Sequence, residues 1–154
     1  MIAPALYNEN GECLVPDGYE LALRMFPMPA DLNPAGDVFG GWVLSNVDVA
    51  GAIPASRRCG GFLTTKAFNS FQFNQPIRVG DLVTFYSKVV KEGKTSMTVD
   101  VRVIAERRFD FNPDLRVGRG DATYLLVTDA LVTYVAVDKD GNKRKLPPLT
   151  QHND

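Results

Sequence analysis

The stretch Asn33-Pro34-Ala35-Gly36-Asp37-Val38-Phe39-Gly40-Gly41-Trp42, with the run that follows it to Arg58, decides the fold of this chain. Its proline and three glycines interrupt periodic structure, so the first half is predicted to be a loop. From Trp42 onward, apolar residues recur at helical spacing and predict a helix over residues 41–58. Eleven of these eighteen residues are Gly, Ala, Val, Leu, Ile or Trp. We therefore expect a helix that is buried on most sides.

One carboxylate, Asp48, lies in the middle of this expected helix. Burial of an unpaired charge costs on the order of several kcal/mol, so Asp48 needs a partner or a function. It is either a functional acid or a structural carboxylate that is paired across a dimer interface. Six residues further on, Pro54 is expected to kink the helix or to end its regular part, because proline lacks the N–H group.

Outward from the helix, the pattern changes to the period of β-strands. Strands are expected over residues 19–26, 64–74, 82–91, 95–105 and 122–137, the last of them buried on both faces. One apolar helix and four later strands predict an α+β fold in which an antiparallel sheet wraps around one long central helix. Residues 1–16 are expected to be a flexible tail, residues 17–140 the domain, and residues 141–154 a basic extended tail.

The sheet edges predict self-association. A five-stranded sheet has two exposed edges and cannot enclose a helix completely. Pairing with a second copy of the chain would cover one edge and the remaining face of the helix. We therefore expect a homodimer or a multiple of dimers.

Composition excludes several classes of protein. The chain has 154 residues and a formal charge of −1, so it is one domain with no global field to recruit nucleic acid or a membrane. There is no signal peptide and no apolar run near the ~20 residues that span a bilayer, and two cysteines fit a reducing compartment, so a cytoplasmic protein is expected. The single histidine, His152, is third from the C-terminus. Histidine bases, Ser-His-Asp triads and histidine-rich metal sites are therefore not expected.

Residues 30–52, which include the Gly-Asp-Val-Phe-Gly-Gly-Trp segment and Asp48, resemble the YciA-type acyl-CoA thioesterases, a hotdog-fold family. Residues 71–81, 91–96 and 128–138 resemble the post-helix strand, the hairpin and the last strand of that family. The resemblance covers residues 20–148. The chain departs from the family pattern in three places: Pro54 in the helix, Gln75 where a basic residue is usual, and a longer polar loop over residues 107–120.

This resemblance implies a hotdog fold, an obligate dimer that often assembles into a hexamer as a trimer of dimers, and hydrolysis of acyl-CoA thioesters without a metal or another cofactor. It places the catalytic acid at Asp48. Elementary chemistry agrees, because thioester hydrolysis needs a base or nucleophile and donors for the oxyanion. The N–H groups of Gly40 and Gly41 at the helix N-terminus are the candidate donors, although these glycines could also serve only a close helix–sheet contact.

The remaining candidate site residues are assigned to substrate binding. Asn33 is either a site residue or the acceptor of a turn, and basic side chains such as Arg58 and Lys94 are candidates for the CoA phosphates. The full set of substrate-binding candidates is Asn33, Asp37, Phe39, Arg58, Asn69, Lys94, Thr95 and Ser96. A second acid, Asp129, is expected to be a satisfied buried carboxylate rather than a second base.

Two classes of function stay open at this point. The first is an acyl-CoA hydrolase, in which Asp48 either attacks the thioester or activates water. The second is a non-catalytic hotdog protein that binds acyl-CoA as a sensor. A hotdog dehydratase is a weaker alternative, because it would need a catalytic histidine.

Overall fold

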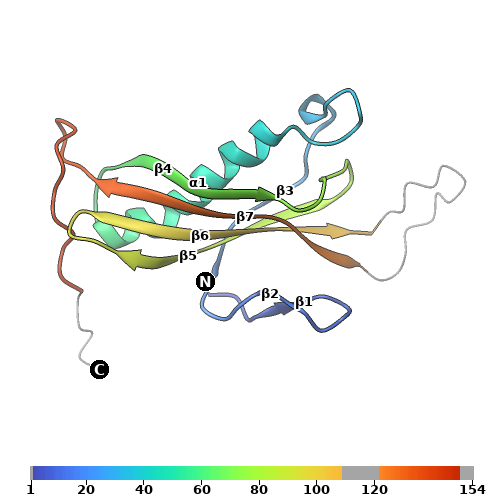
Figure 1. Ribbon diagram of the computed structural model, residues 1–154, viewed down its shortest axis with the longest axis horizontal. Coiled ribbons are helices and arrows are strands. Elements are labelled where there is room, and N and C mark those ends of the chain that lie inside the picture. The colour runs from blue at the N-terminus through green and yellow to red at the C-terminus, as the bar shows by residue number, and fades with distance from the viewer. Residues whose placement is uncertain (1, 109–121, 150–154) are drawn as a thin grey trace, which may run out of the picture.

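The computed structural model describes residues 2–108 and 122–149 and shows one long α-helix packed across one face of an antiparallel sheet, with a short 3-10 helix, Pro29–Asp31, before it (Figure 1). The sheet has five strands in the order β3-β5-β6-β7-β4. The elements are β3 (Glu20–Met25), α1 (Gly40–Cys59), β4 (Leu63–Phe73), β5 (Leu82–Glu92), β6 (Ser96–Arg107) and β7 (Thr123–Ala136). This architecture confirms the predicted fold class, and the bounds agree with the expected ones to within one or two residues.

Side chains on the face of the sheet that meets α1 form the main core. Strand β6 follows the predicted alternation, because Met97, Val99, Val101 and Val103 are all fully buried. Strand β7 contributes Ala130, Val132 and Tyr134 to the same core. Its opposite face is only partly covered, since Asp129, Leu131 and Thr133 are half-buried. The expectation that this strand is buried on both faces was therefore wrong for this stretch.

The helix α1 buries one face and exposes the other. Val43, Val47 and Ala50 are buried against the sheet, whereas Leu44 is 39% exposed and Val49 is 51% exposed. The expectation of a helix buried on most sides was thus wrong for the single chain. An exposed apolar helix face needs a cover, and residues 2–108 and 122–149 of the single chain do not supply one.

The helix continues through Pro54 to Cys59, so of the two effects expected of this proline, the end of the regular helix does not occur. The carbonyl of Ala50, four residues earlier, would normally accept the N–H that proline lacks. The buried hydroxyl of Ser87 on β5 donates to that carbonyl instead, at 2.9 Å. A side chain from the sheet therefore replaces the missing helical hydrogen bond.

This replacement predicts a coupling between Ser87 and Pro54. Ser87→Ala should lower the free energy of unfolding by about 1–3 kcal/mol, because the Ala50 carbonyl is left buried without its donor. In a Pro54→Ala background, the new backbone N–H can bond the same carbonyl, so the cost of Ser87→Ala should fall below about 1 kcal/mol. Urea unfolding of the four variants at one protein concentration measures the cycle. An equal cost in both backgrounds would contradict the account.

The N-terminal segment is not a loose tail. It forms a two-stranded antiparallel unit, β1 (Leu6–Tyr7) and β2 (Cys13–Val15), on the side of the sheet opposite α1 (Figure 1). Leu14 and Val15 are buried there in a small second core with Tyr86 and Ile104. The expectation of a flexible tail was wrong because these strands are too short to show a period in sequence, and their stability comes from the apolar contact.

The described part of the basic C-terminal segment folds back onto the end of the helix. The Arg144 guanidinium donates to the carbonyl of Cys59 at 2.7 Å and to that of Val137 at 2.9 Å. It therefore satisfies a carbonyl at the helix C-terminus, where cations are favoured. At the other long connection, Arg107 belongs to β6 rather than to the loop, and residues 109–120 of that loop lie outside the described residues.

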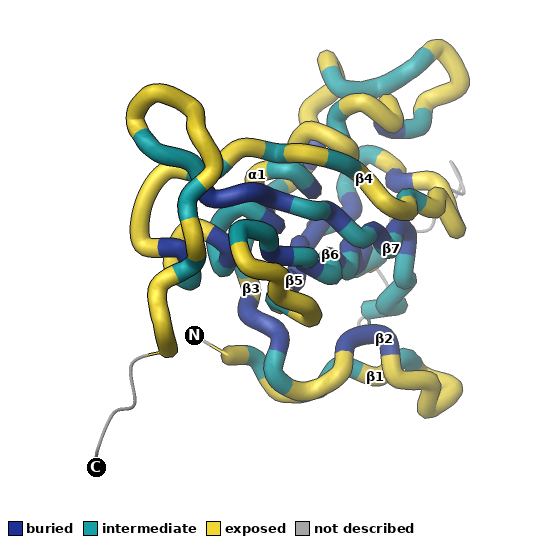
Figure 2. The backbone as a smooth tube through the Cα atoms, turned by 60° about the vertical axis from the view of Figure 1, so that its left-hand side comes forward, coloured by how far each residue is buried: buried dark blue, intermediate teal, exposed yellow. Residues whose placement is uncertain are grey.

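Strand β4 occupies one edge of the sheet and is poorly covered along its whole length (Figure 2). It runs for eleven residues, and none of them is buried. Its apolar side chains include Phe68, 37% exposed, and Phe73, 58% exposed. A long apolar edge with unpaired backbone groups is a template for pairing with another strand.

Candidate active site

Asp48 lies on α1 beside the edge strand β4. The hydroxyl of Thr65 on β4 donates a hydrogen bond of 2.6 Å to the Asp48 carboxylate. Both residues line a pocket of about 320 Å³ that is open to the surface and walled by Val49, Ala52 and Ile53. The hydrogen bond from Thr65 holds the Asp48 carboxylate in a fixed orientation. Asp48 is only half-buried in the single chain, so its carboxylate remains accessible.

A second contact fixes the backbone of the same residue. The buried hydroxyl of Tyr134 on β7 donates to the carbonyl of Asp48 at 2.6 Å. Tyr134 and Thr65 are direct cross-strand neighbours, so one position in the sheet holds both the side chain and the main chain of Asp48. Burial, and then the nearby Asp48 charge, raise the pKa of the Tyr134 hydroxyl well above its usual range. This hydroxyl therefore stays protonated and acts as a donor.

Gly51 makes room for this tyrosine. A Cβ atom at position 51 would lie 2.4 Å from the Tyr134 oxygen, which is far inside contact distance. Gly51 is buried and faces the sheet one turn after Asp48. Glycine at position 51 is therefore required for the close approach of the Tyr134 side chain. This contact between Gly51 and Tyr134 sets the height of Asp48 above the sheet.

The helix N-terminus presents free backbone donors. The carbonyl of Phe39 accepts from the N–H groups of Trp42 and Val43. In the described part of the chain, the N–H groups of Gly40 and Gly41 have no backbone acceptor, as expected for the first turn of a helix. A Cβ atom on Gly41 would meet nothing within 4 Å, whereas one on Gly40 would lie 3.1 Å from the Phe73 ring. Gly40 thus serves a close helix–sheet contact, and Gly41 faces open space.

The loop before the helix is organised by Asn33. Its Oδ1 accepts from the backbone N–H of Ala35 at 2.9 Å and from that of Asp37 at 3.1 Å, as in an Asx turn. Among the described residues, the Nδ2 group of Asn33 has no hydrogen-bond acceptor. The backbone of Asp37 pairs with that of Arg78 in an isolated β-bridge. Phe39 is exposed next to Gly40. The structure therefore places Asn33, Asp37 and Phe39 together at the helix N-terminus.

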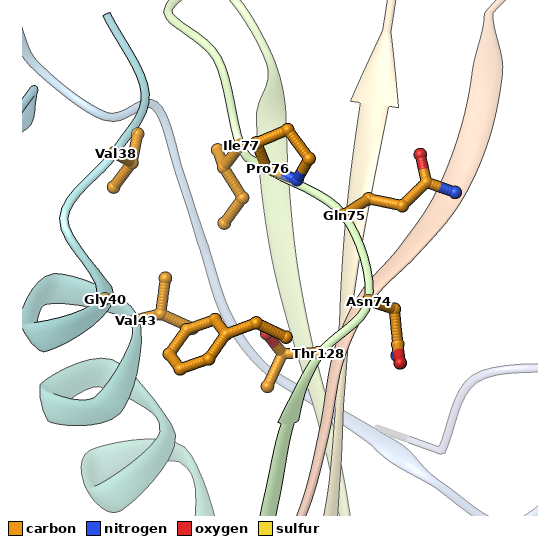
Figure 3. A pocket seen from close by; sticks show the side chains of 9 residues that line it. Val38, Gly40, Val43, Asn74, Gln75, Pro76, Ile77 and Thr128 are labelled. Carbon is orange, nitrogen blue, oxygen red and sulfur yellow. The ribbon is translucent and has the colours of Figure 1, made fainter. Parts of the chain in front are cut away.

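A pocket of about 380 Å³ opens beside this N-terminus (Figure 3). Val38, Gly40 and Val43 line it from the side of the helix. Phe73, Ile77 and Thr128 line it from the side of the sheet. Its walls are thus mainly apolar, and it adjoins the free donors of the first helical turn.

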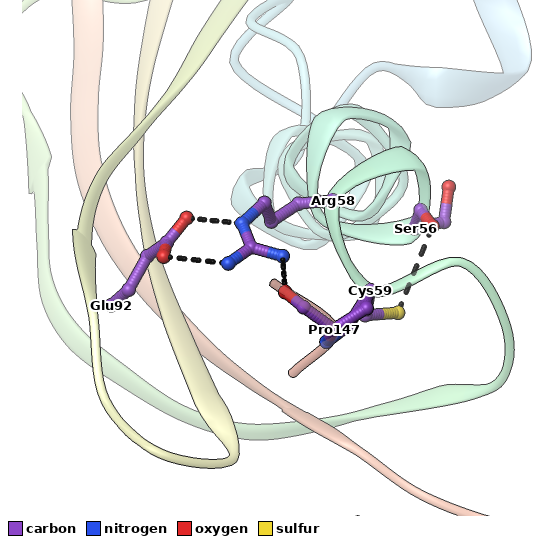
Figure 4. A network of polar contacts seen from close by, with 5 residues as sticks. All are labelled: Ser56, Arg58, Cys59, Glu92 and Pro147. Atoms are coloured by element: carbon purple, nitrogen blue, oxygen red, sulfur yellow. Dashed lines mark hydrogen bonds and ion pairs between the residues drawn. The ribbon is translucent and has the colours of Figure 1, made fainter. Parts of the chain in front are cut away.

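The basic and hairpin candidates lie at the opposite end of the helix. Arg58 makes a two-pronged ion pair with Glu92, at 2.6 and 3.0 Å, and donates to the carbonyl of Pro147 at 2.7 Å (Figure 4). Lys94 and Thr95 lie in the turn between β5 and β6, Ser96 begins β6, and the Lys94 side chain is exposed. A role for Arg58 in phosphate binding would require this ion pair to break, whereas Lys94 is accessible.

Asn69 and Asp129 are directed to the other face of the sheet. The Asn69 amide donates to the hydroxyl of Thr133 at 2.6 Å. The neighbours of Thr133 along β7 face the helix, so Thr133 faces the other side of the sheet. Asp129 accepts from the Asn74 amide at 2.9 Å. The structure therefore does not bring Asn69 to Asp48 within one chain, and it gives Asp129 a hydrogen-bond partner.

Within one chain, the candidates other than Asn69 form two groups, one at each end of the helix, with Asp48 between them. Gly40 and Asp48 are separated by eight helical residues, which correspond to about 12 Å along the axis. A reacting carbonyl and its attacking group must approach within about 3–3.5 Å. The free donors at the helix N-terminus and the carboxylate of the same helix therefore do not converge on one point.

Two residues that hold Asp48 are absent from the set of sequence candidates, namely Thr65 and Tyr134. A tyrosine inside an apolar strand is a usable signal, because a buried hydroxyl needs a hydrogen-bond partner. Thr65 gives no comparable signal, since threonine is common in strands. In residues 2–108 and 122–149, no cluster of three His, Cys, Asp or Glu side chains could hold a metal ion. Within these ranges, no helix is long and apolar enough to cross a membrane.

Known proteins resemble this chain over most of its length. A family model described as thioesterase superfamily matches residues 35–108. The acyl-CoA thioester hydrolase YciA of Salmonella typhimurium is 39% identical over 128 residues, which are 83% of this chain and 90% of that protein. A hexameric hotdog-fold thioesterase of Campylobacter jejuni has 41% identity and a TM-score of 0.74, over 83% of this chain and 90% of its own. A hexameric thioesterase of Yersinia pestis has 38% identity and a TM-score of 0.73, over 87% and 100%.

Proposed function

The chain belongs to the YciA-type acyl-CoA thioester hydrolases of the thioesterase superfamily, and from this premise we propose that it cleaves acyl-CoA to a carboxylic acid and CoA with Asp48 as the base or nucleophile. The observation that carries the proposal is the accessible Asp48 carboxylate, which Thr65 orients at 2.6 Å while Tyr134 holds its backbone. Fixed orientation is what a general base or nucleophile needs. The N–H groups of Gly40 and Gly41 are the proposed oxyanion donors.

The reaction needs both of these groups at one carbonyl, and the edge strand β4 indicates how they meet. Two copies of β4, Leu63–Phe73, can pair antiparallel about the middle of the strand at Phe68. In that register Thr65 lies opposite Phe71 of the partner subunit. Pairing of this kind satisfies the unpaired edge groups and places Phe68 at the centre of the interface.

This register brings the two halves of a site together. Asp48 bonds to Thr65, and Gly40 lies against Phe73, so both helix positions are tied to known points on β4. Thr65 lies opposite the partner's Phe71, which is two residues from the partner's Phe73. Asp48 and the partner's Gly40 are therefore offset by only about 7 Å along the strand direction. Each Asp48 therefore faces the helix N-terminus of the other subunit. The exposed Val49 and Leu44 are covered by the same contact.

Assembly is accordingly expected to be obligatory. Light scattering at micromolar concentration should show a dimer or a multiple of dimers. We propose a trimer of dimers because the related thioesterases of Campylobacter jejuni and Yersinia pestis are hexameric.

Phe68→Asp at the centre of the edge should dissociate the dimer, because like charges would then face each other at the two-fold axis. A folded and active monomer would contradict this assembly.

The CoA phosphates are proposed to bind Lys94, which is exposed at the turn next to the helix C-terminus. Lys94→Glu should raise KM for acyl-CoA about 3- to 10-fold at low salt with little change in kcat, as the loss and reversal of an exposed ion pair implies. The difference should shrink as salt rises. Lys139→Glu, an equal charge change on an exposed turn, is the matched control. Unchanged KM in the Lys94 variant would move the phosphate site to the segment of residues 143–145.

The alternative function is an acyl-CoA sensor that does not turn its ligand over. The test is release of free thiol from a panel of acyl-CoA thioesters, followed with a thiol reagent. Stoichiometric binding without thiol release by the wild-type protein would favour the sensor. Turnover that is lost in an Asp48 variant supports the hydrolase.

A further inference from the structure

Thr128 is an unusual residue in its place on β7. Along the helix-facing side of this strand the following positions are Ala130, Val132 and Tyr134, and all are buried in the apolar core. Thr128 is 1% exposed, and its register partners are Val103 on β6 and Phe73 on β4. In the described part of the chain, its hydroxyl oxygen is buried and has no hydrogen-bond partner.

An unpaired buried hydroxyl is unfavourable, and valine would fill the same space without it. Tyr134, the other polar residue of this row, shows the usual solution, because its hydroxyl bonds to the Asp48 carbonyl. Thr128 differs in that the residue borders an open space, while its hydroxyl oxygen is buried. Thr128 lines the pocket of about 380 Å³ next to Gly40.

The other polar side chains of that pocket do not serve it. Figure 3 shows the amide groups of Asn74 and Gln75 directed away from Gly40 and Val43, whereas the Thr128 side chain lies at the wall of the pocket formed by the sheet. Asn74 also donates to Asp129 on the other face of the sheet. Thr128 is therefore the one polar side chain that faces the apolar walls Val38, Val43 and Ile77 among the described lining residues.

We infer that this pocket takes the acyl group of the substrate and that the Thr128 hydroxyl hydrogen-bonds to an oxygen on a short acyl chain. The substrate class is then a short hydroxyacyl- or oxoacyl-CoA rather than a purely saturated one. The inference rests on the proposed function, in which the thioester carbonyl lies at the Gly40 and Gly41 N–H groups beside the pocket mouth. The volume is at the low end for ligand pockets, which favours a short chain.

The physical basis is the asymmetry of buried hydrogen bonds. The buried Thr128 hydroxyl has no hydrogen-bond partner among the described residues, and only an acyl chain with its own oxygen can supply the missing bond. A site that offers a polar group to a substrate oxygen therefore discriminates against the analogue that lacks the oxygen. A saturated chain of equal length is still bound by the apolar walls, but it leaves Thr128 unpaired.

The test compares 3-hydroxybutyryl-CoA with butyryl-CoA by thiol release in the wild-type protein, in Thr128→Val and in Thr128→Ser. The wild type should favour the hydroxylated substrate in kcat/KM. Thr128→Val should lower that preference about 10-fold, which corresponds to one neutral hydrogen bond. The loss in kcat/KM should be about 10-fold smaller for butyryl-CoA than for 3-hydroxybutyryl-CoA, and Thr128→Ser should keep the preference because it keeps the hydroxyl.

Each other outcome has a defined meaning. Equal loss on both substrates in Thr128→Val would overturn the inference, because it indicates a packing role. A wild-type enzyme that hydrolyses both substrates with equal kcat/KM would overturn it without any variant, even if Thr128→Val does not fold. No thiol release from either substrate by the wild type would instead contradict the proposed function itself.

Discussion

Replacement of Asp48 by alanine or asparagine is expected to lower the turnover of acyl-CoA by at least ~10²-fold, the low end for loss of a general base. The carboxylate is the acceptor of the Thr65 hydroxyl and lies in an accessible pocket beside the edge strand. Its removal takes away the group that attacks or activates water, whereas Gly40, Gly41 and the apolar pocket stay in place. Thiol release under saturating substrate measures the effect.

The fold should survive this change, because Asp48 makes no ion pair within the described residues and the hydrogen bond from Tyr134 goes to its backbone carbonyl, which every variant keeps. Thermal unfolding should therefore occur at or above the wild-type temperature, since loss of a partly buried charge removes a desolvation cost. Asp129→Asn is the matched control: this acid lies on the other face of the sheet and bonds to Asn74. Near-normal turnover in Asp48→Ala would remove Asp48 from the reaction.

The second large effect is recovery of activity when two inactive variants are mixed. Asp48→Ala lacks the acid, and Gly41→Phe blocks the helix N-terminus. Each should be inactive alone. If each site combines Asp48 of one subunit with Gly41 of the other, a mixed dimer keeps one intact site of two. Random pairing makes half of the dimers mixed, so about a quarter of all sites should work.

The structure makes Gly41 the better of the two glycines for this experiment. A Cβ atom there meets nothing within 4 Å, so a large side chain projects outward without disturbing its own chain. The same change at Gly40 would collide with the Phe73 ring at 3.1 Å and confuse blockage with misfolding. The variants are unfolded, mixed in equal amounts and refolded. If no activity returns although mixed dimers form, each subunit carries its own complete site.

The fold was largely predictable from local patterns, and the failures have a common cause. Strand β6 could be predicted because Met97 to Val103 alternate without interruption. The continuation of the helix through Pro54 could not, because the compensating donor, Ser87, is 37 residues from the Ala50 carbonyl that it serves. The burial of Leu14 and Val15 also depends on distant residues, Tyr86 and Ile104. Local sequence carries no information on such contacts.

The candidate site shows the same division. Asp48 could be singled out because a charge within an apolar helical pattern is rare, and the resemblance pointed to the same residue. Thr65 and Tyr134 could not be paired with it, since their meeting depends on the register of β4 and β7. Charge alone makes Arg58 a candidate for phosphate binding, and its ion pair with Glu92 follows from where β5 ends beside the helix.

The contact between Gly51 and Tyr134 also restricts how such a sequence can change over evolutionary time. A methyl group at position 51 and a hydroxyl at position 134 would compete for the same space, 2.4 Å apart. An alanine at position 51 therefore first requires a smaller residue at 134, and a smaller residue at 134 removes the donor that bonds the Asp48 carbonyl. Each single step is unfavourable, so we expect the two positions to change together or not at all, which would keep the height of Asp48 above the sheet.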